Sequence, residues 1–393
     1  MSYWEKAIEI KEETIKHRRN IHGFAEVGLE LPKTVEYVMQ QLRACGIEPK
    51  KCGKGVVASI GSGKKSILLR ADMDALPLNE ENNLDFKAVN GNNHACGHDF
   101  HAAMLLSAAK LLKENEKNLK GTVIFMFQPA EETFEGSRNM LENGLLEEYP
   151  ADAALAYHVG AGKMPVGMFM YNDSTTMMYS NDFFKIKVQG KGAHGAYPEM
   201  SIDSINILMH IYMALQEVIA RETDPKSSCV LTVGKISAGN AANIIPDKAF
   251  MEGTIRTNNE SEREKIKRRV RDIVELTAKT FRGEAEVEFF SEVPMLKCNE
   301  KLTGDFVSYM KELPIPGLSG VSGIESSASD DFARITEKMP ATYMYLSAGF
   351  EDERGDYGAH NPKVQFNEDV CPVGVACLAH CAERWLEENS RGE

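Results

Sequence analysis

The stretch TVIFMFQPAEE, residues 122–132, runs through five consecutive apolar side chains and ends in two adjacent glutamates. A short, continuous apolar run is typical of a strand that is covered on both faces, as in the sheet of an α/β protein. Two neighbouring carboxylates at the end of such a strand are costly to bury unless a cation or a proton lies between them. The stretch therefore predicts a layered α/β fold with a functional site at the edge of its sheet.

The segments around this stretch alternate between strand and helix. VVASIG (56–61) and SILLRAD (66–72) are expected to be strands, residues 101–115 a helix, and AALAYHVG (153–160) another strand. We expect GSGKK to join the first two strands as a hairpin, because the first glycine of a phosphate-binding loop is missing there. Helices that alternate with buried strands favour a mostly parallel, doubly wound sheet with flanking helices.

The middle of the chain follows a different pattern. Its expected elements, in order, are a strand at 183–190, a helix at 201–222, strands at 229–237 and 248–257, a helix at 261–281 and a strand at 284–290. The order β-α-β-β-α-β is that of a ferredoxin-like α+β sandwich. We therefore predict a discontinuous catalytic domain of residues 1–179 and 294–393, interrupted by an inserted domain of residues 180–293.

Composition narrows the possible functions. The 393 residues include 45 basic and 58 acidic side chains, a formal charge of −13, which argues against nucleic acid as a partner. The first 20 residues are charged throughout, and no run of 18 apolar residues occurs, so we expect a cytoplasmic protein with no membrane partner. The eight cysteines are then expected to be reduced thiols, and only Cys96 lies among other potential metal ligands.

Polar side chains cluster where the expected strands end, which is where open α/β sheets place their sites. The five segments are ADMDALP (71–77), HACGHD (94–99), QPAEE (128–132), AYHVG (156–160) and GAHNP (358–362). Taken singly, Asp74 could be a turn residue and Asp99 a helix cap. Together, their histidine, cysteine and carboxylate groups suit zinc, manganese, cobalt or nickel. A nucleophilic pair of Cys96 and a histidine is the rival interpretation, and it leaves the two glutamates without a role.

Six motifs in register make the resemblance specific. They are RADMDALP, HACGHDFHAAML, FQPAEE, GKGAHGAYP, GNAANIIPD and GTIRT, and their order and spacing resemble those of the dinuclear-metal amidohydrolases. This family of metallopeptidases includes hippurate hydrolase, auxin-conjugate hydrolases and N-acyl-amino-acid deacylases. The resemblance implies hydrolysis of the amide bond of an N-acyl amino acid by a hydroxide bound to one of two divalent metal ions.

The resemblance also implies roles for individual residues. The implied metal ligands are Cys96, His98, Glu132, His158 and His360. Glu131 matches the general base, and Asp74 matches an acid that orients a ligand from behind. Asp72 stands where distant relatives have a ligand, so both ligation and support remain open for it. His101, one helical turn after His98, is expected to pack or cap rather than to ligate.

In the inserted domain, His194 matches a histidine that reaches the active site of a neighbouring subunit and stabilises the tetrahedral oxyanion. Asn243 and Arg256 match positions that grip the substrate carboxylate; taken alone, they would be a turn residue and a solvated strand residue. A homodimer or larger homo-oligomer through the inserted domain is implied, with the helix at 201–222 or the strand near 229–237 as the natural interface.

The chain departs from the family pattern at a few positions. In SASDDF, Asp330 stands where a glutamate is usual, and Ala25 replaces a common proline. Because none of the implied ligands or the base is missing, we expect catalytic competence. Two alternatives stay open: a metallo-dipeptidase on the same site, and a catalytically silent protein that binds amino-acid conjugates.

Overall fold

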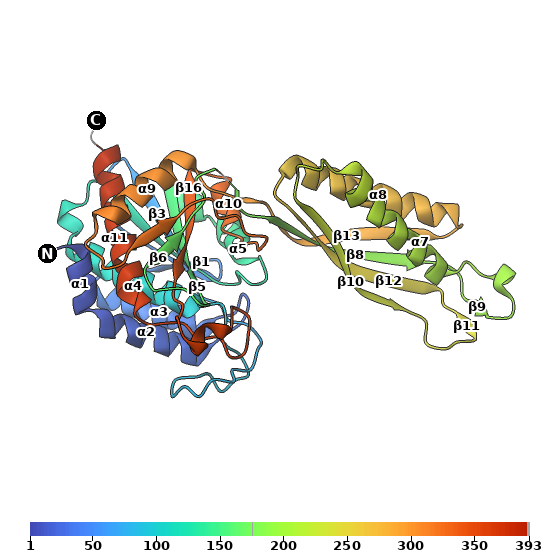
Figure 1. Ribbon diagram of the computed structural model, residues 1–393, viewed down its shortest axis with the longest axis horizontal. Helices are drawn as coiled ribbons and strands as arrows, with labels where there is room; N and C mark the ends of the chain where they lie inside the picture. The colour runs from blue at the N-terminus through green and yellow to red at the C-terminus, as the bar shows by residue number, and fades with distance from the viewer. Residues whose placement is uncertain (175, 391–393) are drawn as a thin grey trace. The chain divides into compact units, whose positions relative to one another are not determined.

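The computed structural model describes residues 1–174 and 176–390 and divides the chain into two compact units (Figure 1). The larger unit comprises residues 1–177, 297–325 and 330–393, and the smaller unit residues 178–296 and 326–329. The predicted borders fall between residues 179 and 180 and between residues 293 and 294. The return of residues 326–329 to the smaller unit has no counterpart in the sequence prediction.

The larger unit is built on a mostly parallel sheet, as predicted. In the described part of the chain its eight strands, in spatial order, are β1 (Lys50–Cys52), β2 (Gly55–Gly61), β4 (Thr122–Gln128), β3 (Ser66–Asp72), β5 (Ala153–Gly160), β16 (Ala341–Ser347), β6 (Met168–Met170) and β15 (Ser319–Val321). The central strands β4, β3, β5 and β16 run parallel to one another. Their carboxyl ends therefore meet at one edge, which carries the polar segments named above.

The expected hairpin between β2 and β3 is wrong. β4 lies between these strands, antiparallel to β2 and parallel to β3. The connecting turn closes around the start of β4: Gly61 has φ +73°, and a Cβ atom there would lie 2.4 Å from the carbonyl oxygen of Gly121. The glycines of this turn thus allow its backbone to lie close to the start of β4. β2 and β3 do not pair with each other as a hairpin.

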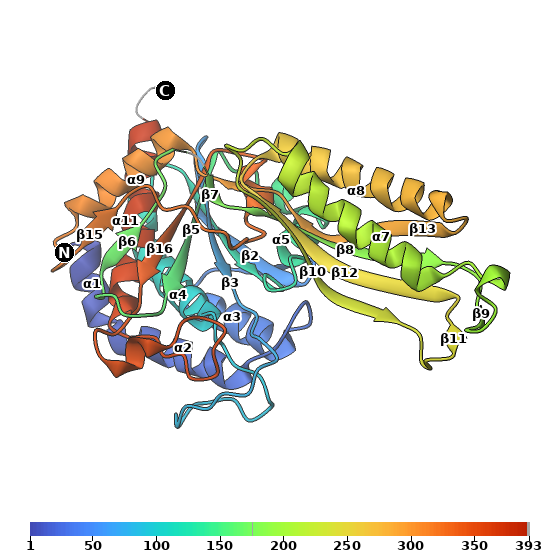
Figure 2. The ribbon, with the colours of Figure 1, turned by 45° about the vertical axis from the view of Figure 1, so that its right-hand side comes forward.

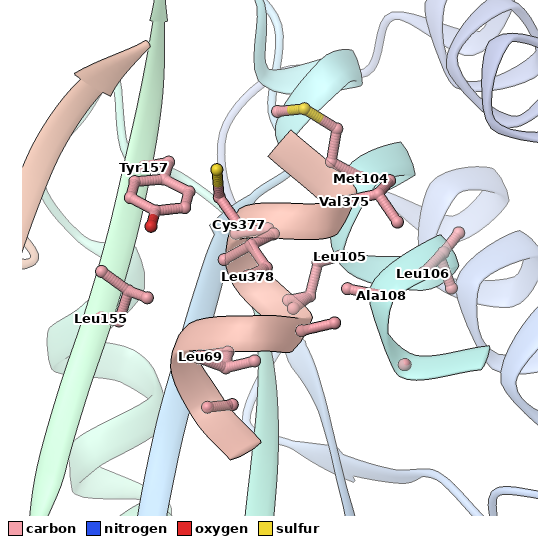
Figure 3. Close-up of a cluster of buried hydrophobic side chains, with 14 of the residues drawn as sticks. Leu69, Met104, Leu105, Leu106, Ala108, Leu155, Tyr157, Val375, Cys377 and Leu378 are labelled. Carbon is pink, nitrogen blue, oxygen red and sulfur yellow. The ribbon is translucent and has the colours of Figure 1, made fainter. Parts of the chain in front are cut away.

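Helices cover both faces of this sheet. The longer ones are α2 (Lys11–Phe24), α3 (Pro32–Ala44), α4 (His98–Glu114), α9 (Glu300–Glu312) and α11 (Val370–Asn389), with the short α1 (Tyr3–Glu9), α5 (Gly136–Glu142), α6 (Leu145–Glu148) and α10 (Ala333–Thr336). The first two helices, α1 and α2, are divided at Ile10. Figure 3 shows side chains of α4 and α11 meeting those of β3 and β5 in the core, among them the buried Leu105, Leu69 and Leu155. This packing fixes the start of α4 against the sheet.

The smaller unit has the expected ferredoxin-like order. Its four-stranded sheet consists of β10 (Cys229–Ala238), β12 (Lys248–Thr257), β8 (Ser180–Gln189) and β13 (Glu284–Val293), in that spatial order and all antiparallel. Helices α7 (Ser204–Glu217) and α8 (Glu260–Thr280) lie on the same side of this sheet (Figure 2). Phe184, Ile186 and Ile207 belong to the apolar core between the helices and the strands.

The other face of the smaller sheet carries no helix of its own unit and presents alternating charges. Lys235, Glu252, Lys185 and Glu288 stand opposite one another across the four strands. The Nζ atom of Lys185 lies 2.9 Å from Glu252, and that of Lys235 lies 3.4 Å from it. We call these four residues the charge ladder. Within residues 1–174 and 176–390, no helix has both the length and the apolar character that crossing a bilayer requires.

Candidate metal centre

A tight turn after β4 presents the two glutamates. Ala130 has φ +51°, and its carbonyl oxygen accepts hydrogen bonds from the N–H groups of Glu135 and Gly136. The buried carboxylate of Asp74, which follows the neighbouring strand β3, stabilises this turn. It accepts hydrogen bonds from the N–H groups of Glu131 (3.0 Å) and Glu132 (3.1 Å). Asp74 therefore fixes the backbone of both glutamates, besides lying 3.4 Å from Nδ1 of His98.

The loop before α4 brings Cys96 and His98 against β5. Gly97 has φ +88°, and a Cβ atom there would lie 2.4 Å from Val159, so only glycine allows this approach. As a result, Sγ of Cys96 lies 3.4 Å from Nε2 of His158. The Nδ1–H group of His158 donates to the carbonyl oxygen of Val159 at 2.8 Å, which turns Nε2 toward the cysteine. Burial lowers the pKa of His158, so its ring is neutral, the form that binds metals.

His360 joins this group from near the end of the chain. Its backbone is left-handed (φ +63°), and its N–H group donates to the carbonyl oxygen of Ala95 at 2.9 Å. This hydrogen bond docks the loop 358–362 on the segment that precedes Cys96. The Nε2 atom of His360 then lies 3.3 Å from Oε1 of Glu132. The structure thus brings together all five residues that the resemblance implies as metal ligands.

The five side chains form two groups of three donors, and Cys96 belongs to both. One group is Cys96, His98 and His158, and the other is Cys96, Glu132 and His360; the donor atoms within each group lie within 4.8 Å of one another. Two atoms that bind one ion at about 2.1 Å lie about 3.4 Å apart in a tetrahedral site. The separations of 3.3 and 3.4 Å given above fit this geometry.

Hydrogen bonding supports the same conclusion. The Nε2 atom of the buried His98 is surrounded by Asp72, Glu131 and Glu132 at 3.8, 3.9 and 4.0 Å, yet it makes no hydrogen bond to any described residue. Burial raises the pKa of the Cys96 thiol to about 12, so a thiolate forms here only beside a cation. The donor set therefore fits two divalent metal ions.

The carboxylate of Glu131 lies beside this centre. It is buried and points toward Asp330 and Asp331, with oxygen atoms of the three side chains within 4.8 Å of one another. Burial raises the pKa of Glu131 well above its ordinary value, and the carboxylates of Asp330 and Glu132 raise it further. A carboxylate in this setting takes up a proton readily, which is what a general base requires.

Asp72 and His101 brace the site. The Nδ1 atom of His101 is hydrogen-bonded to Oδ1 of Asp72, and its Nε2 atom accepts the N–H group of Val159 at 2.8 Å. The other oxygen of Asp72 accepts from Nη1 of Arg70 at 2.6 Å. Both ring nitrogens and both carboxylate oxygens are engaged. Neither ring nitrogen of His101 is left for a metal ion, and Asp72 is held in place by His101 and Arg70.

The sequence analysis did not identify Arg70, a buried cation next to the candidate metal centre. Arg70, fully buried in β3, donates to both oxygens of Asp330 at 2.9 and 3.2 Å and to Gln128 at 3.0 Å. Asp331 accepts the N–H group of Ser137 at 2.8 Å and so ties the same segment to the turn that carries the glutamates. The signal was present, because an arginine inside the apolar run SILLRAD requires buried anionic partners.

The smaller unit holds the remaining candidates. His194 lies in β9 (Ala193–His194), which pairs with β11 (Ile244–Ile245), and the carbonyl oxygen of Asn243 accepts the N–H group of Gly195 at 2.8 Å. The structure therefore brings His194 and Asn243 together. The Nδ1 atom of His194 accepts the N–H group of Ala196 at 3.1 Å, and the side chain is exposed.

Arg256 lies apart from that pair, because Asn243 precedes the first residue of β12 and Arg256 is next to its last. Its Nη1 atom donates to Asn181 and to Ser329. In the described part of the chain, no carboxylate lies within 4.0 Å of the guanidinium of Arg256; burial lowers its pKa, and the more distant carboxylate of Asp182 opposes this shift. Arg256 is therefore a half-buried cation whose partners are neutral.

Comparison with known proteins gives consistent matches over nearly the whole chain. Residues 68–384 match the model of the peptidase family M20/M25/M40. The IAA-amino acid hydrolase ILR1-like 2 of Arabidopsis thaliana is 34% identical, over 98% of this chain and 88% of the relative. The N-acetyl-L-cysteine deacetylase of Bacillus subtilis is 33% identical, over 98% of this chain and 91% of the relative.

Solved structures agree with these matches. A putative aminohydrolase from methicillin-resistant Staphylococcus aureus has a TM-score of 0.91 at 28% identity, with 98% of each chain covered. A dinuclear metal binding peptidase of Bacillus subtilis has a TM-score of 0.81 at 30% identity, covering 96% of this chain and 99% of that chain.

Proposed function

The chain belongs to the peptidase family M20/M25/M40 and is a metal-dependent hydrolase, and from this premise we propose that it cleaves the amide bond between an acyl group and an amino acid. The observation that carries the proposal is the pair of donor groups that share Cys96, with the buried carboxylate of Glu131 beside them. Relatives named for IAA-amino acids, N-acetylcysteine and N-acetyldiaminopimelate support an N-acyl amino acid as the substrate class.

Cys96, His98 and His158 would hold one ion, and Cys96, Glu132 and His360 the other. When bound, two such ions polarise the substrate carbonyl and lower the pKa of the attacking water. Donors of this kind suit manganese, zinc, cobalt or nickel. His98 is buried, Cys96, Glu132 and His158 are partly buried, and His360 is exposed, so four of the five donors are held within the sheet edge before an ion arrives.

Glu131 would accept the proton of the attacking water and pass it to the nitrogen of the leaving amine. Its backbone N–H group donates to the carboxylate of Asp74, which keeps the side chain beside the donor atoms. Asp74 acts in this scheme as a positioning residue, since its own carboxylate is occupied by the two N–H groups of the turn.

Arg256 would bind the α-carboxylate of the substrate, which would supply the anionic partner that the guanidinium does not find among the described residues. His194 would stabilise the oxyanion of the tetrahedral intermediate, with Asn243 beside it. The length of β12 separates Arg256 from Asn243, about 25 Å at 3.3 Å per residue, so one copy cannot bring both groups to one substrate. This separation supports a homodimer in which His194 and Asn243 serve the partner's substrate.

The smaller unit offers a surface for such a dimer. On α7, Met209 and Met213 are 37% and 64% exposed, and Ile236 on the edge strand β10 is 45% exposed. An unpaired edge strand beside exposed methionines favours association with a second copy. Sedimentation of the wild type and of Met213→Glu tests this step separately from the chemistry. A monomeric wild type would contradict it.

A panel of matched substrates tests the proposed function. It contains N-benzoylglycine, N-acetyl amino acids and an indole-acetyl amino acid, each also as the amide at its α-carboxylate, and dipeptides with a free amino group. Metal content is measured by mass spectrometry after loading with manganese or zinc. We expect turnover of the N-acyl acids, with kcat/KM at least about 100-fold lower when the carboxylate is blocked.

The same panel separates the alternatives. Preference for dipeptides would favour a dipeptidase, an option supported by 36% identity to thermostable carboxypeptidase 1 of Saccharolobus solfataricus. No turnover of any substrate by protein that holds two metal ions would favour a silent binding protein.

A further inference from the structure

In the smaller unit, the guanidinium of Arg256 is bound at one nitrogen and free at the other two. Its Nη1 atom donates to Oδ1 of Asn181 and, at 3.4 Å, to Oγ of Ser329. Its Nε and Nη2 atoms make no hydrogen bond to any described residue, yet neither is among the fully buried polar atoms that lack a partner. Both atoms are therefore open to a ligand. Together they present two parallel N–H groups, the arrangement that binds both oxygens of a carboxylate.

Asn181 is fixed in the smaller sheet with its oxygen toward Arg256. It lies in β8 directly opposite Arg256 in β12, so the two side chains share one face of the sheet. The side chain of Asn181 is fully buried. Its Nδ2 atom donates to the carbonyl oxygen of Ser291 at 3.1 Å, and its Oδ1 atom also accepts the hydroxyl group of Thr254 at 3.0 Å. Because a backbone carbonyl can only accept, the amide cannot be turned around, and its oxygen must face the guanidinium.

Ser329 supplies the second acceptor. It belongs to residues 326–329, the segment that returns to the smaller unit. Its hydroxyl group donates to the carbonyl oxygen of Tyr179 at 2.8 Å, which leaves the lone pairs of Oγ for the Nη1–H group of Arg256. The returning segment thus contributes a second neutral oxygen to the same nitrogen of the guanidinium.

The carboxylate next in the sequence is bound by other cations. Asp182 is fully buried and accepts hydrogen bonds from Nε and Nη2 of Arg263 at 2.7 and 2.8 Å, and Nζ of Lys267 lies 3.4 Å from it. Successive residues of a strand point to opposite faces of the sheet, so Asp182 faces α8 and Asn181 does not. Among the described residues, no carboxylate lies within 4.0 Å of the guanidinium of Arg256. Arg263 therefore has a carboxylate partner in its own chain, whereas Arg256 has only neutral partners.

We propose that Asn181, with Ser329, is a positioning residue that reserves the charge of Arg256 for the substrate. The two oxygen atoms fix Nη1, so that Nε and Nη2 are held for the α-carboxylate of an N-acyl amino acid. An aspartate at position 181 would accept the same hydrogen bond and would also neutralise the guanidinium. The neutrality of this one side chain therefore determines how strongly substrates with a free carboxylate are preferred over their amides. This role rests on the carboxylate binding proposed above for Arg256 and adds a determinant of its selectivity.

Asn181→Asp tests the proposal, because aspartate keeps the shape of the side chain and adds the charge. Ser329→Asp places a carboxylate at the second acceptor and is an independent variant if Asn181→Asp folds poorly. With manganese-loaded proteins, KM and kcat are measured for N-benzoylglycine and N-benzoylglycinamide, and isothermal titration in the Glu131→Gln background gives Kd without turnover. We expect Asn181→Asp to raise KM and Kd for the acid about tenfold, the scale of one charge-assisted hydrogen bond. The kcat value and both constants for the amide should stay unchanged.

Two further variants show whether the effect acts through Arg256. Asn118→Asp makes the same change at an exposed position of the larger unit, just before β4, and should alter neither constant. In the Arg256→Gln background, Asn181→Asp should have little further effect on the acid, because the charge that it neutralises is already gone. Equal losses on acid and amide, or an undiminished effect of Asn181→Asp in the Arg256→Gln background, would overturn the proposal.

Failure of this proposal is distinguishable from failure of the carboxylate binding on which it rests. If Arg256→Gln raises KM and Kd for the acid while Asn181→Asp and Ser329→Asp do not, Arg256 binds the carboxylate and only the role of Asn181 is overturned. If Arg256→Gln changes neither constant, or if the wild type binds the acid no more tightly than the amide, both are overturned.

Discussion

The two units use similar charged pairs in opposite surroundings. In the larger unit, Arg70 is fully buried and its hydrogen bonds go to Asp72, Gln128, Asp330 and Asp331. In the smaller unit, Lys185 and Glu252 face each other across two strands at an exposed surface. Removing one partner of a buried pair leaves an uncompensated charge, whereas an exposed pair is largely solvated by water. The charges that matter for the chemistry should therefore be those under the sheet edge of the larger unit.

The largest effect is expected at Glu131. Glu131→Gln keeps the shape of the side chain and removes its ability to accept a proton. We expect kcat to fall about 10³- to 10⁴-fold, in the upper range for loss of general acid–base catalysis. Metal content, measured by mass spectrometry, should stay at the wild-type level. Retained activity in a fully metal-loaded variant would contradict the assignment.

Arg70→Leu removes the buried cation of the larger unit. It leaves Asp72 and Asp330 buried without their cation, and we expect a loss of about 3–5 kcal/mol in the free energy of unfolding. Urea denaturation followed by fluorescence measures this loss. A loss below about 1 kcal/mol would mean that the carboxylates find other compensation.

Metal removal should destabilise the two units unequally. Chelation takes the cations from His98, Glu132 and Cys96, and a ligand bound at several hundred times its Kd contributes about 3–4 kcal/mol to the unit that holds it. Scanning calorimetry should show the transition of the larger unit at lower temperature, with that of the smaller unit unchanged. Equal shifts of both transitions would argue that the metals do not bind where the donors meet.

Arg256→Gln tests whether a cation of the smaller unit binds the substrate carboxylate. It keeps hydrogen bonding to Asn181 possible and removes the charge, so the fold should be little affected. We expect KM for an N-acyl amino acid to rise about tenfold or more, with no change for the substrate amidated at its carboxylate. The amidated substrate is the internal control, and an equal loss on both substrates would contradict a carboxylate-binding role.

The smallest effect is expected on the charge ladder. Lys185→Met removes the Nζ atom that lies 2.9 Å from Glu252. Because the pair is solvated, we expect the Tm to change by less than about 2 °C. Differential scanning fluorimetry of Lys185→Met and Arg70→Leu under the same conditions compares the two changes in Tm. A similar decrease in Tm in both variants would show that the exposed pair stabilises the protein as much as the buried one.

Much of the fold follows from periodicity. The strands at 153–160 and 248–257 have the predicted bounds, and the inserted unit has the predicted element order, because alternation and apolar runs reflect which faces are buried. Strand adjacency failed for β2 and β3. Strand pairing depends on contacts between residues that are distant in sequence. Gly61 and Gly63 lie close to the backbone of Gly121, about 60 residues further along the chain.

Some residues of the candidate site could be predicted from the sequence, and others could not. Cys96, His98 and the glutamates are recognisable because their types and spacing match metal chemistry, and the structure gathers them with His158 and His360. Arg70 was missed because a single arginine in a strand has many ordinary explanations until Asp330, 260 residues away, is seen beside it.

The strand order also sets a sequence of events during synthesis. β5 pairs with β3 on one side, but its other neighbour, β16, begins only at residue 341, after the whole inserted unit. The inserted unit can complete its own sheet from residues 178–296, so it can fold while the larger sheet still exposes an open edge. His360 emerges later still. On the ribosome, the five candidate donors can therefore gather only after residue 360 has emerged, and a product that ends before this residue lacks one of them.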